Sequence, residues 1–374
     1  MRRSSGISRA TSAWALAKIA VQGGRSGAEA RAATSGASSR TPASTPRGTP
    51  IARRQCSVIS RRGADSLMRR PFNPLLRSCM SCEEASFPGQ FSGRGSRREG
   101  AAAVSDPLPV SPWPIQGRPA VLVTGASSGI GAELARQAAR ERLPMLLVAR
   151  GMAALTALAE ELTATGGEAH TLSLDLTAPG AVAAIGAALL RHGLVCDVLV
   201  NNAGQGLVGA AADLSAADQL GILDLNLRAA VALALAALPG MRQRRQGGIL
   251  NVGSIAGFMP GPGMALYYAS KAGLRSFSEA LWQEARGHGV VVTLLCPGPV
   301  RTPFLERSGA GKARIFRMLP KAKAQRVAIR GWAGFRRGKR LVFPDRLSWL
   351  IARVAPLLPR RLLLGLLARL QQQR

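Results

Sequence analysis

Residues 120–131 read AVLVTGASSGIG, a short apolar run followed by a turn rich in glycine and serine. The run is apolar and β-branched and predicts a buried strand, and Ala132–Glu141 after the turn predicts a helix. Glycine lets the backbone approach a phosphate closely, and a helix N-terminus supplies free N–H groups and a positive dipole end. The stretch therefore predicts a strand, a phosphate-binding turn and a helix, as in a dinucleotide site.

The turn glycines have the spacing G-x-x-x-G-x-G rather than the more common G-x-G-x-x-G. A glycine pattern alone is weak evidence, because a plain strand-to-helix turn also uses glycine. Its position between a strand and a helix is the context that a dinucleotide site requires. The residues that we expect to contact a dinucleotide here are Gly125, Ser127, Ser128, Gly129, Ile130 and Gly131.

Segments of strand and helix composition alternate along the central chain. Further strands are expected at Met145–Ala149, Ala169–Leu174, Asp197–Val200, Gly248–Val252, Val290–Cys296 and Leu341–Phe343, and further helices at Met152–Thr165, Ala178–Arg191, Ala211–Met241 and Met264–Gly287. Strands that alternate with helices form a parallel sheet covered on both faces. The predicted fold is α/β: a Rossmann-type, doubly wound sheet of seven parallel strands with helices on both faces.

The net charge of +30 is concentrated at the two ends of the 374-residue chain. Residues 1–116 carry +12, residues 117–311 carry +2 and residues 312–374 carry +16. Basic ends can bind nucleic acid, anionic lipid or an acidic partner, but a coding sequence rich in arginine codons gives the same bias. The N-terminal block has almost no aromatic residues for stacking on bases, so no nucleic-acid partner is expected.

Composition divides the chain into three segments. Residues 1–116 lack helical or strand periodicity and are expected to be disordered. They fit an organelle transit peptide, an interaction tail or a start codon assigned too far upstream. Order is expected to begin near Arg118, after a linker-like Ser111–Pro114, in an α/β domain over residues 117–345; residues 346–374 form a basic amphipathic extension. A cytoplasmic location is expected, or an organelle if the transit peptide is genuine.

The five cysteines do not suggest a disulfide framework in a chain of this length. Cys196 and Cys296 lie in strand-like runs and are expected to be buried thiols. The Cys79-x-x-Cys82 pair has no second pair beside it, so no metal site is expected. No uninterrupted apolar run of about 18 residues occurs, so no membrane-spanning helix is expected.

The residue after the second strand bears on the choice of cofactor. A fold that binds NAD usually has an acidic residue there for the ribose 2′-hydroxyl, whereas an arginine suits a 2′-phosphate. Here Met145–Ala149 is followed by Arg150. We therefore expect NADP(H) in preference to NAD(H), although an exposed arginine at a helix start would look the same.

The two tyrosines of the chain, Tyr267 and Tyr268, are adjacent and precede Lys271 in a helical segment. Both spacings place a phenol and the ammonium on one helix face, so spacing does not choose between the tyrosines. A neighbouring ammonium favours the phenolate and brings its pKa closer to neutrality, which suits proton transfer to a carbonyl oxygen. Ser254, after the strand that ends at Val252, would add a hydrogen bond to that oxygen.

Taken together, these motifs resemble the short-chain dehydrogenase/reductase family over roughly residues 117–345. The matching residues, in the family's order and near its spacing, are Thr124–Gly131, Asp175, Asn201–Gly204, Asn226, Gly253–Ser254, Tyr267-x-x-x-Lys271 and Pro297–Thr302.

The resemblance selects Tyr267 as the general acid/base. It implies that Lys271 lowers the pKa of Tyr267 and binds the nicotinamide ribose, that Ser254 polarises the substrate carbonyl and that Asn226 positions a relay water. Tyr268 matches a variable position and is expected to pack or to line the pocket rim. The further cofactor contacts that the resemblance implies are Asp175, Leu176, Asn202, Ala203, Gly204, Pro297, Val300 and Thr302.

The C-terminal part should hold the family's variable substrate lid, within Arg301–Arg337. Its basic residues Arg314, Arg317, Lys321 and Lys323 fit a solvated face or an acidic substrate. Trp349–Leu370 is apolar with regularly spaced arginines, and Pro356 and Pro359 divide it. Three states remain open for it: docking onto the protein, contact with an anionic membrane, and disorder.

The sequence thus predicts an NADP(H)-dependent oxidoreductase that interconverts a carbonyl and a secondary alcohol by hydride transfer, on a small hydrophobic substrate. One alternative is a reductase of lipids or steroids at a membrane surface. Another, from a different class, is a basic nucleic-acid-binding protein, which lacks a recognised reader motif here. We expect a homo-oligomer, either a dimer or a tetramer.

Overall fold

The computed structural model describes residues 111–371. The predictions for residues 1–110, including the Cys79-x-x-Cys82 motif, lie outside the described residues. Seven parallel strands form one sheet in the order β3-β2-β1-β4-β5-β6-β9. Their bounds are β1 Arg118–Thr124, β2 Met145–Ala149, β3 Ala169–Ser173, β4 Leu194–Asn201, β5 Gly247–Val252, β6 Val290–Leu295 and β9 Leu341–Val342. The predicted fold class and its seven strands are confirmed.

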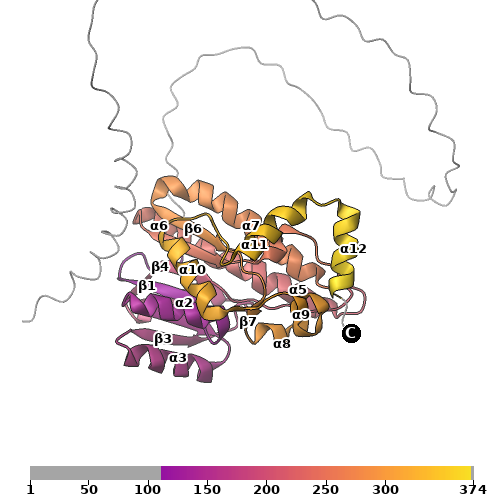
Figure 1. Cartoon of the computed structure of the whole chain (residues 1–374). Helices are drawn as coiled ribbons and strands as arrows, with labels where there is room; N and C mark the ends of the chain where they lie inside the picture. Colours follow the sequence, from indigo (N-terminus) through magenta and orange to yellow (C-terminus); the bar gives the residue numbers. More distant parts are fainter. Residues whose placement is uncertain (1–110, 372–374) are drawn as a thin grey trace, which may run out of the picture. The chain divides into compact units, whose positions relative to one another are not determined.

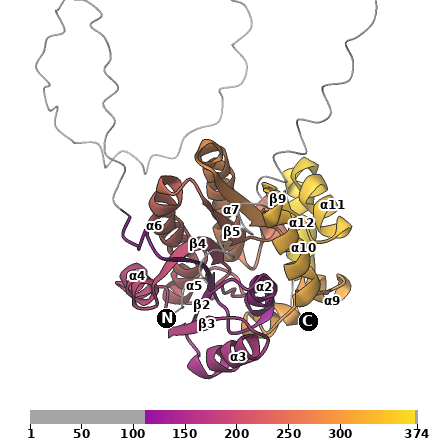
Figure 2. The same ribbon diagram turned by 90° about the vertical axis from the view of Figure 1, so that its left-hand side faces the viewer.

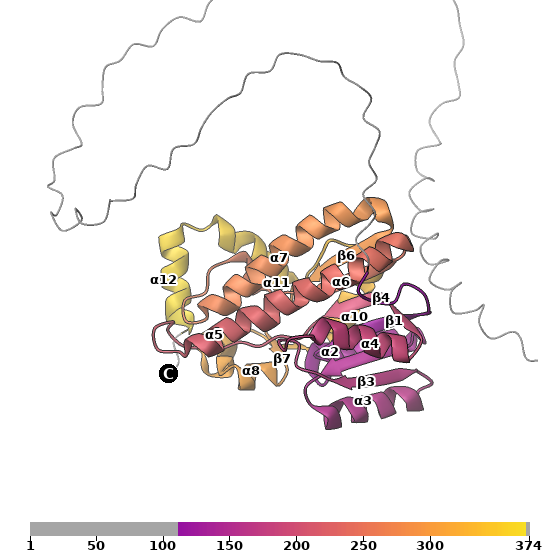
Figure 3. The same cartoon turned by 180° about the vertical axis from the view of Figure 1, so that it is seen from behind.

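Helices cover both faces of this sheet. The buried side chains of α2 (Gly129–Arg140), α3 (Met152–Ala164) and α10 (Ala324–Arg336) form one core layer with the sheet. Those of α4 (Ala181–Arg191), α6 (Ala230–Gln243) and α7 (Ala265–Ala285) form the other. Figure 1 shows α2 beside α10, and Figure 3 shows α4, α6 and α7 from behind.

The strand order reverses direction between β1 and β4. The chain builds outward from β1 to β3, then returns to the other side of β1 and builds outward to β9. Helices that leave neighbouring strands in opposite directions open a crevice at the carboxyl ends of those strands. The fold therefore places a ligand site beyond the ends of β1 and β4.

The remaining elements lie around that edge of the sheet, except the helical turn Arg286–His288, which precedes β6 at the amino edge. They are α5 (Ala216–Leu223), a π-helical turn (Asp224–Ala229), β7 (Val300–Arg301), α8 (Phe304–Arg307), α9 (Arg314–Met318), β8 (Ala322–Lys323), α11 (Arg346–Val354) and α12 (Arg360–Gln371), with single helical turns at Ile255–Phe258, Arg286–His288, Ala310–Lys312 and Ala355–Leu357. Figure 2 shows α9, α11 and α12 on the side of the sheet away from α4. The predicted break at Pro356 and Pro359 is confirmed, because α11 ends at Val354 and α12 begins at Arg360.

The packed chain begins earlier than Arg118. Trp113 lies in the second core layer with 4% of its surface exposed, and its indole N–H donates to the Val182 carbonyl at 2.8 Å. The expectation of a linker at Ser111–Pro114 was therefore wrong, because a large aromatic side chain with a hydrogen-bond partner anchors this segment to α4.

The helix predicted from Ala211 begins at Ala216 instead. The Ser215 hydroxyl caps it by accepting a hydrogen bond from the Asp218 N–H at 3.4 Å. The continuous helix Ala216–Gln243 has the length and mean hydropathy, 1.7, of a membrane span, although no such helix was expected. Leu233, Ala234 and Ala237 pack into the core layer beside the sheet, so we interpret it as a core helix.

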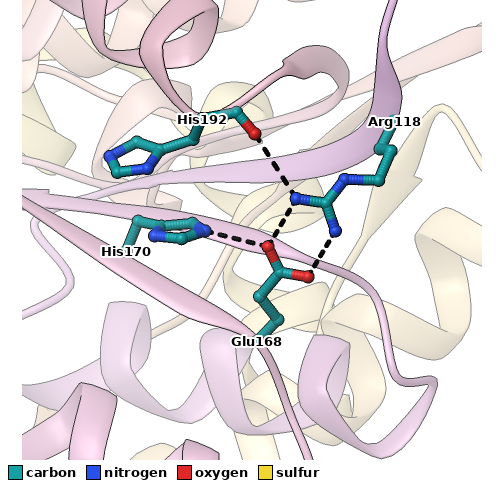
Figure 4. A network of polar contacts seen from close by, with 4 residues as sticks. All are labelled: Arg118, Glu168, His170 and His192. Atoms are coloured by element: carbon teal, nitrogen blue, oxygen red, sulfur yellow. Dashed lines mark hydrogen bonds and ion pairs between the residues drawn. The ribbon is translucent and has the colours of Figure 1, made fainter.

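The amino edge of the sheet carries a polar network away from the crevice (Figure 4). Arg118 donates two hydrogen bonds to the Glu168 carboxylate, at 2.6 and 2.7 Å, and His170 contacts the same carboxylate at 2.9 Å. The His170 and His192 rings stack with centroids 3.9 Å apart. The network joins the starts of β1, β3 and β4, and the Arg118 guanidinium lowers the pKa of Glu168 to about 2.

Candidate functional site

A cavity of about 1010 Å³ follows the carboxyl edge of the sheet. The β1–α2 turn and the residues after β2 and β3 line one part of it. The α7 residues Tyr267 and Lys271 lie in the middle, and α8, α11 and α12 line the other part. The lining residues come from segments that are far apart in the sequence, and the fold brings them together where its topology predicts a ligand site.

The turn after β1 has the backbone of a phosphate cradle. Gly125 and Gly129 adopt φ angles of +63° and +60°, a region that L side chains rarely adopt. A Cβ added at Gly131 would lie 2.3 Å from Asn202 Nδ2 and 2.4 Å from the Gly125 carbonyl oxygen. These glycines let the turn fold against the end of β4 and bring the N-terminus of α2 to the cavity.

Thr124 and Asn202 tie this turn to the end of β4. The Thr124 hydroxyl donates to the Val200 carbonyl at 3.2 Å and accepts from the N–H groups of Asn202 and Ala203 at 3.0 and 3.1 Å. The Asn202 amide donates to the carbonyls of Thr124 and Gly125. Sequence reasoning quoted Thr124 only as part of a motif, and its bracing role depends on a contact between distant segments.

Ser128 and Arg307 meet at the wall of the cavity. The Arg307 guanidinium, on α8, donates to the Ser128 hydroxyl at 3.2 Å, and both residues line the cavity. Sequence reasoning missed Arg307, since 179 residues separate it from Ser128 and no local pattern marks it. The contact adds a positive charge to the start of α2, where the helix dipole already favours anions.

Arg150 and Asp175 lie at the end of the cavity near β2 and β3. Asp175 accepts hydrogen bonds from the Thr177 N–H at 2.9 Å and the Thr177 hydroxyl at 2.7 Å, and the backbone bond in particular lowers its pKa. The Arg150 charge lowers that pKa further. The two side chains provide a cation and an anion at this end of the cavity.

Three of the four residues of the predicted catalytic group, Ser254, Tyr267 and Lys271, line the middle of the cavity. Tyr267 is partly exposed to it, and the Ser254 hydroxyl lies close enough to favour the ionised form of its phenol. The Ser254 hydroxyl also accepts from the Ala256 N–H at 3.1 Å, which fixes it at the start of a helical turn. Lys271 is buried behind Tyr267, with its Nζ donating to the Val252 carbonyl at 3.0 Å and 5.9 Å from the Tyr267 ring centroid.

The pKa shifts at this site differ from the sequence expectation. Burial raises the pKa of Tyr267, and the neighbouring Ser254 hydroxyl only partly opposes this rise. Burial also lowers the pKa of Lys271 to about 8, so the lysine is a weaker source of positive charge than an exposed one. Burial therefore dominates at Tyr267, which favours a protonated phenol at neutral pH, and the predicted effect of Lys271 on its pKa stays a prediction.

Asn226 lies in the π-helical turn and is 1% exposed. Its amide donates to the Gln205 carbonyl at 2.8 Å and the Ser270 hydroxyl at 3.1 Å, and its oxygen accepts from the Gln205 N–H at 2.8 Å. Both amide protons are thus used within the protein, so the side chain has none left to donate to a relay water. Its visible action is to hold the loop around Gln205 beside Lys271.

Tyr268 also lines the cavity, and its hydroxyl contacts the C-terminal helix. It is 7% exposed, and its hydroxyl accepts a hydrogen bond from Gln371 Nε2 at 2.7 Å. Leu363 and Leu367 of α12 are buried beside it over Met259. The C-terminal segment therefore docks over the cavity, which is one of the three states left open for it.

Most of the predicted site residues meet at this cavity. Its lining includes Gly125, Ser127, Ser128, Gly129, Ile130, Arg150, Asp175, Leu176, Asn202, Ala203, Gly204, Ser254, Tyr267, Lys271, Pro297, Val300 and Thr302. Gly131 and Asn226 lie behind its wall, and neither Arg314, Arg317, Lys321 nor Lys323 lines it. An acidic substrate bound by these four lid residues is therefore not supported.

The residues present fit a dinucleotide. A Cβ on Gly129 would meet the Thr302 methyl group at 2.8 Å, so glycine keeps the cradle open beside β7. The start of α2, Ser128 and Arg307 provide donors and positive charge for a diphosphate. The cavity extends from this cradle to Lys271.

Comparison with known proteins agrees with this site. A model of the family described as short chain dehydrogenase matches residues 119–313. The ketoacyl reductase HetN of Nostoc sp. is 36% identical over 180 residues, which are 48% of this chain and 63% of that protein, so the chain spans less than two thirds of that relative.

Solved structures show the same fold. A short-chain dehydrogenase from Sphingobium yanoikuyae in complex with NADPH superposes with a TM-score of 0.58 at 32% identity, over 68% of this chain and 98% of that one. One from Burkholderia phymatum in complex with NAD gives 0.59 at 25% identity, over 64% and 93%. The chain therefore belongs to the short-chain dehydrogenase/reductase family of oxidoreductases.

Proposed function

We propose that this enzyme is an NADP(H)-dependent reductase of apolar carbonyl compounds in which Tyr267 is the general acid/base. The observation that carries the proposal is the position of Tyr267, beside Ser254, at the junction between the phosphate cradle and the apolar part of the cavity. A carbonyl oxygen held between the two hydroxyls would lie within reach of both.

The residues divide the chemistry as follows. A nicotinamide cofactor, when bound in the cradle, would supply the hydride that reduces the carbonyl carbon. Ser254 donates a hydrogen bond to the carbonyl oxygen and polarises it, and Tyr267 gives that oxygen its proton during reduction. The raised pKa of Tyr267 keeps the phenol protonated at neutral pH, which suits reduction. Lys271 holds the ribose and supplies positive charge behind the phenol.

Preference for NADP(H) is part of the proposal. Arg150 lines the cavity directly after β2, where a 2′-phosphate would lie, and Arg307 adds a second cation near the diphosphate. The Sphingobium relative binds NADPH and the Burkholderia relative binds NAD, so the family allows either cofactor. The local charge of this chain favours the phosphorylated one.

An apolar substrate is proposed from the part of the lining that faces α8, α11 and α12. Phe304, Leu305, Met318 and Leu319 line it from the lid, and Ile351, Leu358, Leu363 and Leu367 line it from the C-terminal segment. Arg307 is the one charged residue among the lining residues from 304 onward within the described chain, and it faces Ser128. A substrate there would be bound mainly by burial of its apolar surface.

A panel of ketones and aldehydes of increasing apolar size tests the function, scored by oxidation of NADPH and of NADH. We expect kcat/KM to rise with apolar size and to favour NADPH by roughly tenfold or more, as for loss of a charged hydrogen bond. Arg150→Ala should remove most of that preference, with Arg301→Ala, an exposed arginine outside the cavity, as its control. An NADH preference, or no reduction of any carbonyl, would contradict the proposal.

A further inference from the structure

The C-terminal segment carries an unusual amount of exposed apolar surface. Of the 14 large hydrophobic side chains that are exposed within the described chain, eight lie in residues 346–371. They are Leu347, Trp349, Leu350, Val354, Leu357, Leu362, Leu364 and Leu366. Scattered exposed leucines are normal in soluble proteins, but such a concentration marks an interaction surface.

Docking onto the protein leaves part of the apolar surface of α12 exposed. Leu363, Leu367 and Gln371 form its buried stripe, one residue per turn. A surface helix normally has polar residues outside such a stripe. Here Leu362, Leu364 and Leu366 lie outside it and remain exposed. The sequence of α12 therefore provides a second apolar surface that this chain does not cover.

Positive charge accompanies the exposed apolar side chains. Residues 346–374 contain no Asp or Glu, and the arginines of α11 and α12 are exposed: Arg346, Arg353, Arg360, Arg361 and Arg369. The Arg353 guanidinium lies 5.6 Å from the Trp349 ring centroid, so charge and aromatic surface share one face of α11. Trp and Leu among arginines are typical of helices that lie in the plane of an anionic bilayer surface.

The same segment forms the mouth of the cavity. Leu350, Val354 and Leu366 are exposed and also line the cavity, as does Met318 of α9. Figures 1 and 3 show α12 at the margin of the folded part of the chain. An apolar rim that continues into an apolar cavity gives a lipid-dissolved molecule a path that avoids water.

We propose that residues 346–371 dock on an anionic membrane surface, with Trp349, Leu357 and Leu362 in the interfacial layer and the arginines at the headgroups. Delivery of an apolar substrate from the bilayer into the cavity would follow, and that part rests on the function proposed above. Binding to the bilayer does not rest on it, so vesicle binding is measured without turnover.

Co-sedimentation of the full chain with phosphatidylcholine vesicles, with and without phosphatidylglycerol, tests the surface. The triple variant Trp349→Ser, Leu357→Ser, Leu362→Ser should reduce partitioning into anionic vesicles by roughly tenfold or more. The matched control is Leu190→Ser, Leu235→Ser, Ile329→Ser, which removes three apolar side chains that are exposed on other helices. Because every protein contains residues 1–116, the charge of that block contributes equally to each.

Three results are informative. Loss of binding in the C-terminal variant alone, with weaker binding of wild type at high salt, supports the proposal. Equal binding of wild type and the C-terminal variant overturns it. Failure of wild type to bind vesicles, together with a smaller particle mass of the C-terminal variant by light scattering, also overturns it and assigns the surface to contact between copies of this chain.

Discussion

Replacing Lys271 with methionine should stabilise the folded protein near pH 7 while it abolishes turnover. Lys271 is 6% exposed, and burial lowers its pKa from 10.5 to about 8. At about 1.4 kcal/mol per pKa unit, this shift means that the ammonium costs the folded state about 3 kcal/mol. Methionine removes the charge at similar length but gives up the hydrogen bond to Val252, at about 1 kcal/mol. A net gain of about 2 kcal/mol is expected.

The pH dependence of that gain identifies its cause. Between the folded pKa of about 8 and the ordinary value of 10.5, the unfolded chain binds the proton of Lys271 more strongly than the folded chain does. The unfolding free energy of wild type therefore rises with pH across this window relative to the variant, and the cost is present in full below it. The advantage of Lys271→Met should be greatest at pH 7 and should shrink steadily towards pH 10.

Urea unfolding of the full chain at each pH from 7 to 10, followed by tryptophan fluorescence, measures both free energies. The matched control is Lys339→Met, at a solvent-exposed lysine, for which no comparable gain is expected. An advantage that stays constant with pH would show that methionine acts through apolar contact alone. A variant less stable than wild type at pH 7 would refute the argument that the buried charge is costly.

Three further substitutions test other parts of the structure. Trp113→Ala should lower the unfolding free energy by about 3–5 kcal/mol, because Trp113 is buried. The control Trp349→Ala removes an exposed tryptophan and should change the unfolding free energy little. Equal urea midpoints for the two variants would contradict the packing of Trp113. Arg307→Ala removes a cation beside the phosphate cradle, so it should raise KM for NADPH by roughly tenfold with little change in kcat. Arg301→Ala is the control. An unchanged KM in Arg307→Ala would exclude a contact between Arg307 and the cofactor. Glu168→Gln should lower the unfolding free energy by less than about 1 kcal/mol above pH 4.5, because Glu168 is partly exposed. In urea titrations, the difference from wild type should vanish as the pH falls towards 2, where Glu168 becomes protonated. A difference that persists at pH 2 would refute the assigned ion pair.

Local pattern predicted much of the fold and of the site, and long-range packing explains what it missed. The turn at Gly125–Gly131 and the helix with Tyr267 were found because their chemistry lies within a few residues. Arg307 and Gln371 act on Ser128 and Tyr268 from distant segments, and nothing in their neighbours marks these contacts. The prolines on both sides of Trp113 are typical of a linker, so the local sequence does not indicate that Trp113 is a core residue.

The direction of the Tyr267 pKa also depends on packing. Spacing indicates that a lysine is near, but not that the lysine is buried and that its own pKa falls to about 8. Desolvation of both side chains decides their protonation, and desolvation depends on what covers them. The sequence identifies the residues of the site. The structure is needed to show that burial of Tyr267 and Lys271 affects their pKa values more than the charges around them do.

The central claim, that Tyr267 is the proton donor, is tested most directly by a comparison of Tyr267→Phe with Tyr268→Phe. Both changes remove one hydroxyl from adjacent rings, and Tyr268 serves as the matched control because its hydroxyl binds Gln371. The rate of carbonyl-dependent NADPH oxidation should fall by at least about a hundredfold in Tyr267→Phe, with NADPH affinity by fluorescence titration retained, and by less than about tenfold in Tyr268→Phe. Near-normal turnover in Tyr267→Phe, or the reverse order of the two variants, would contradict the account.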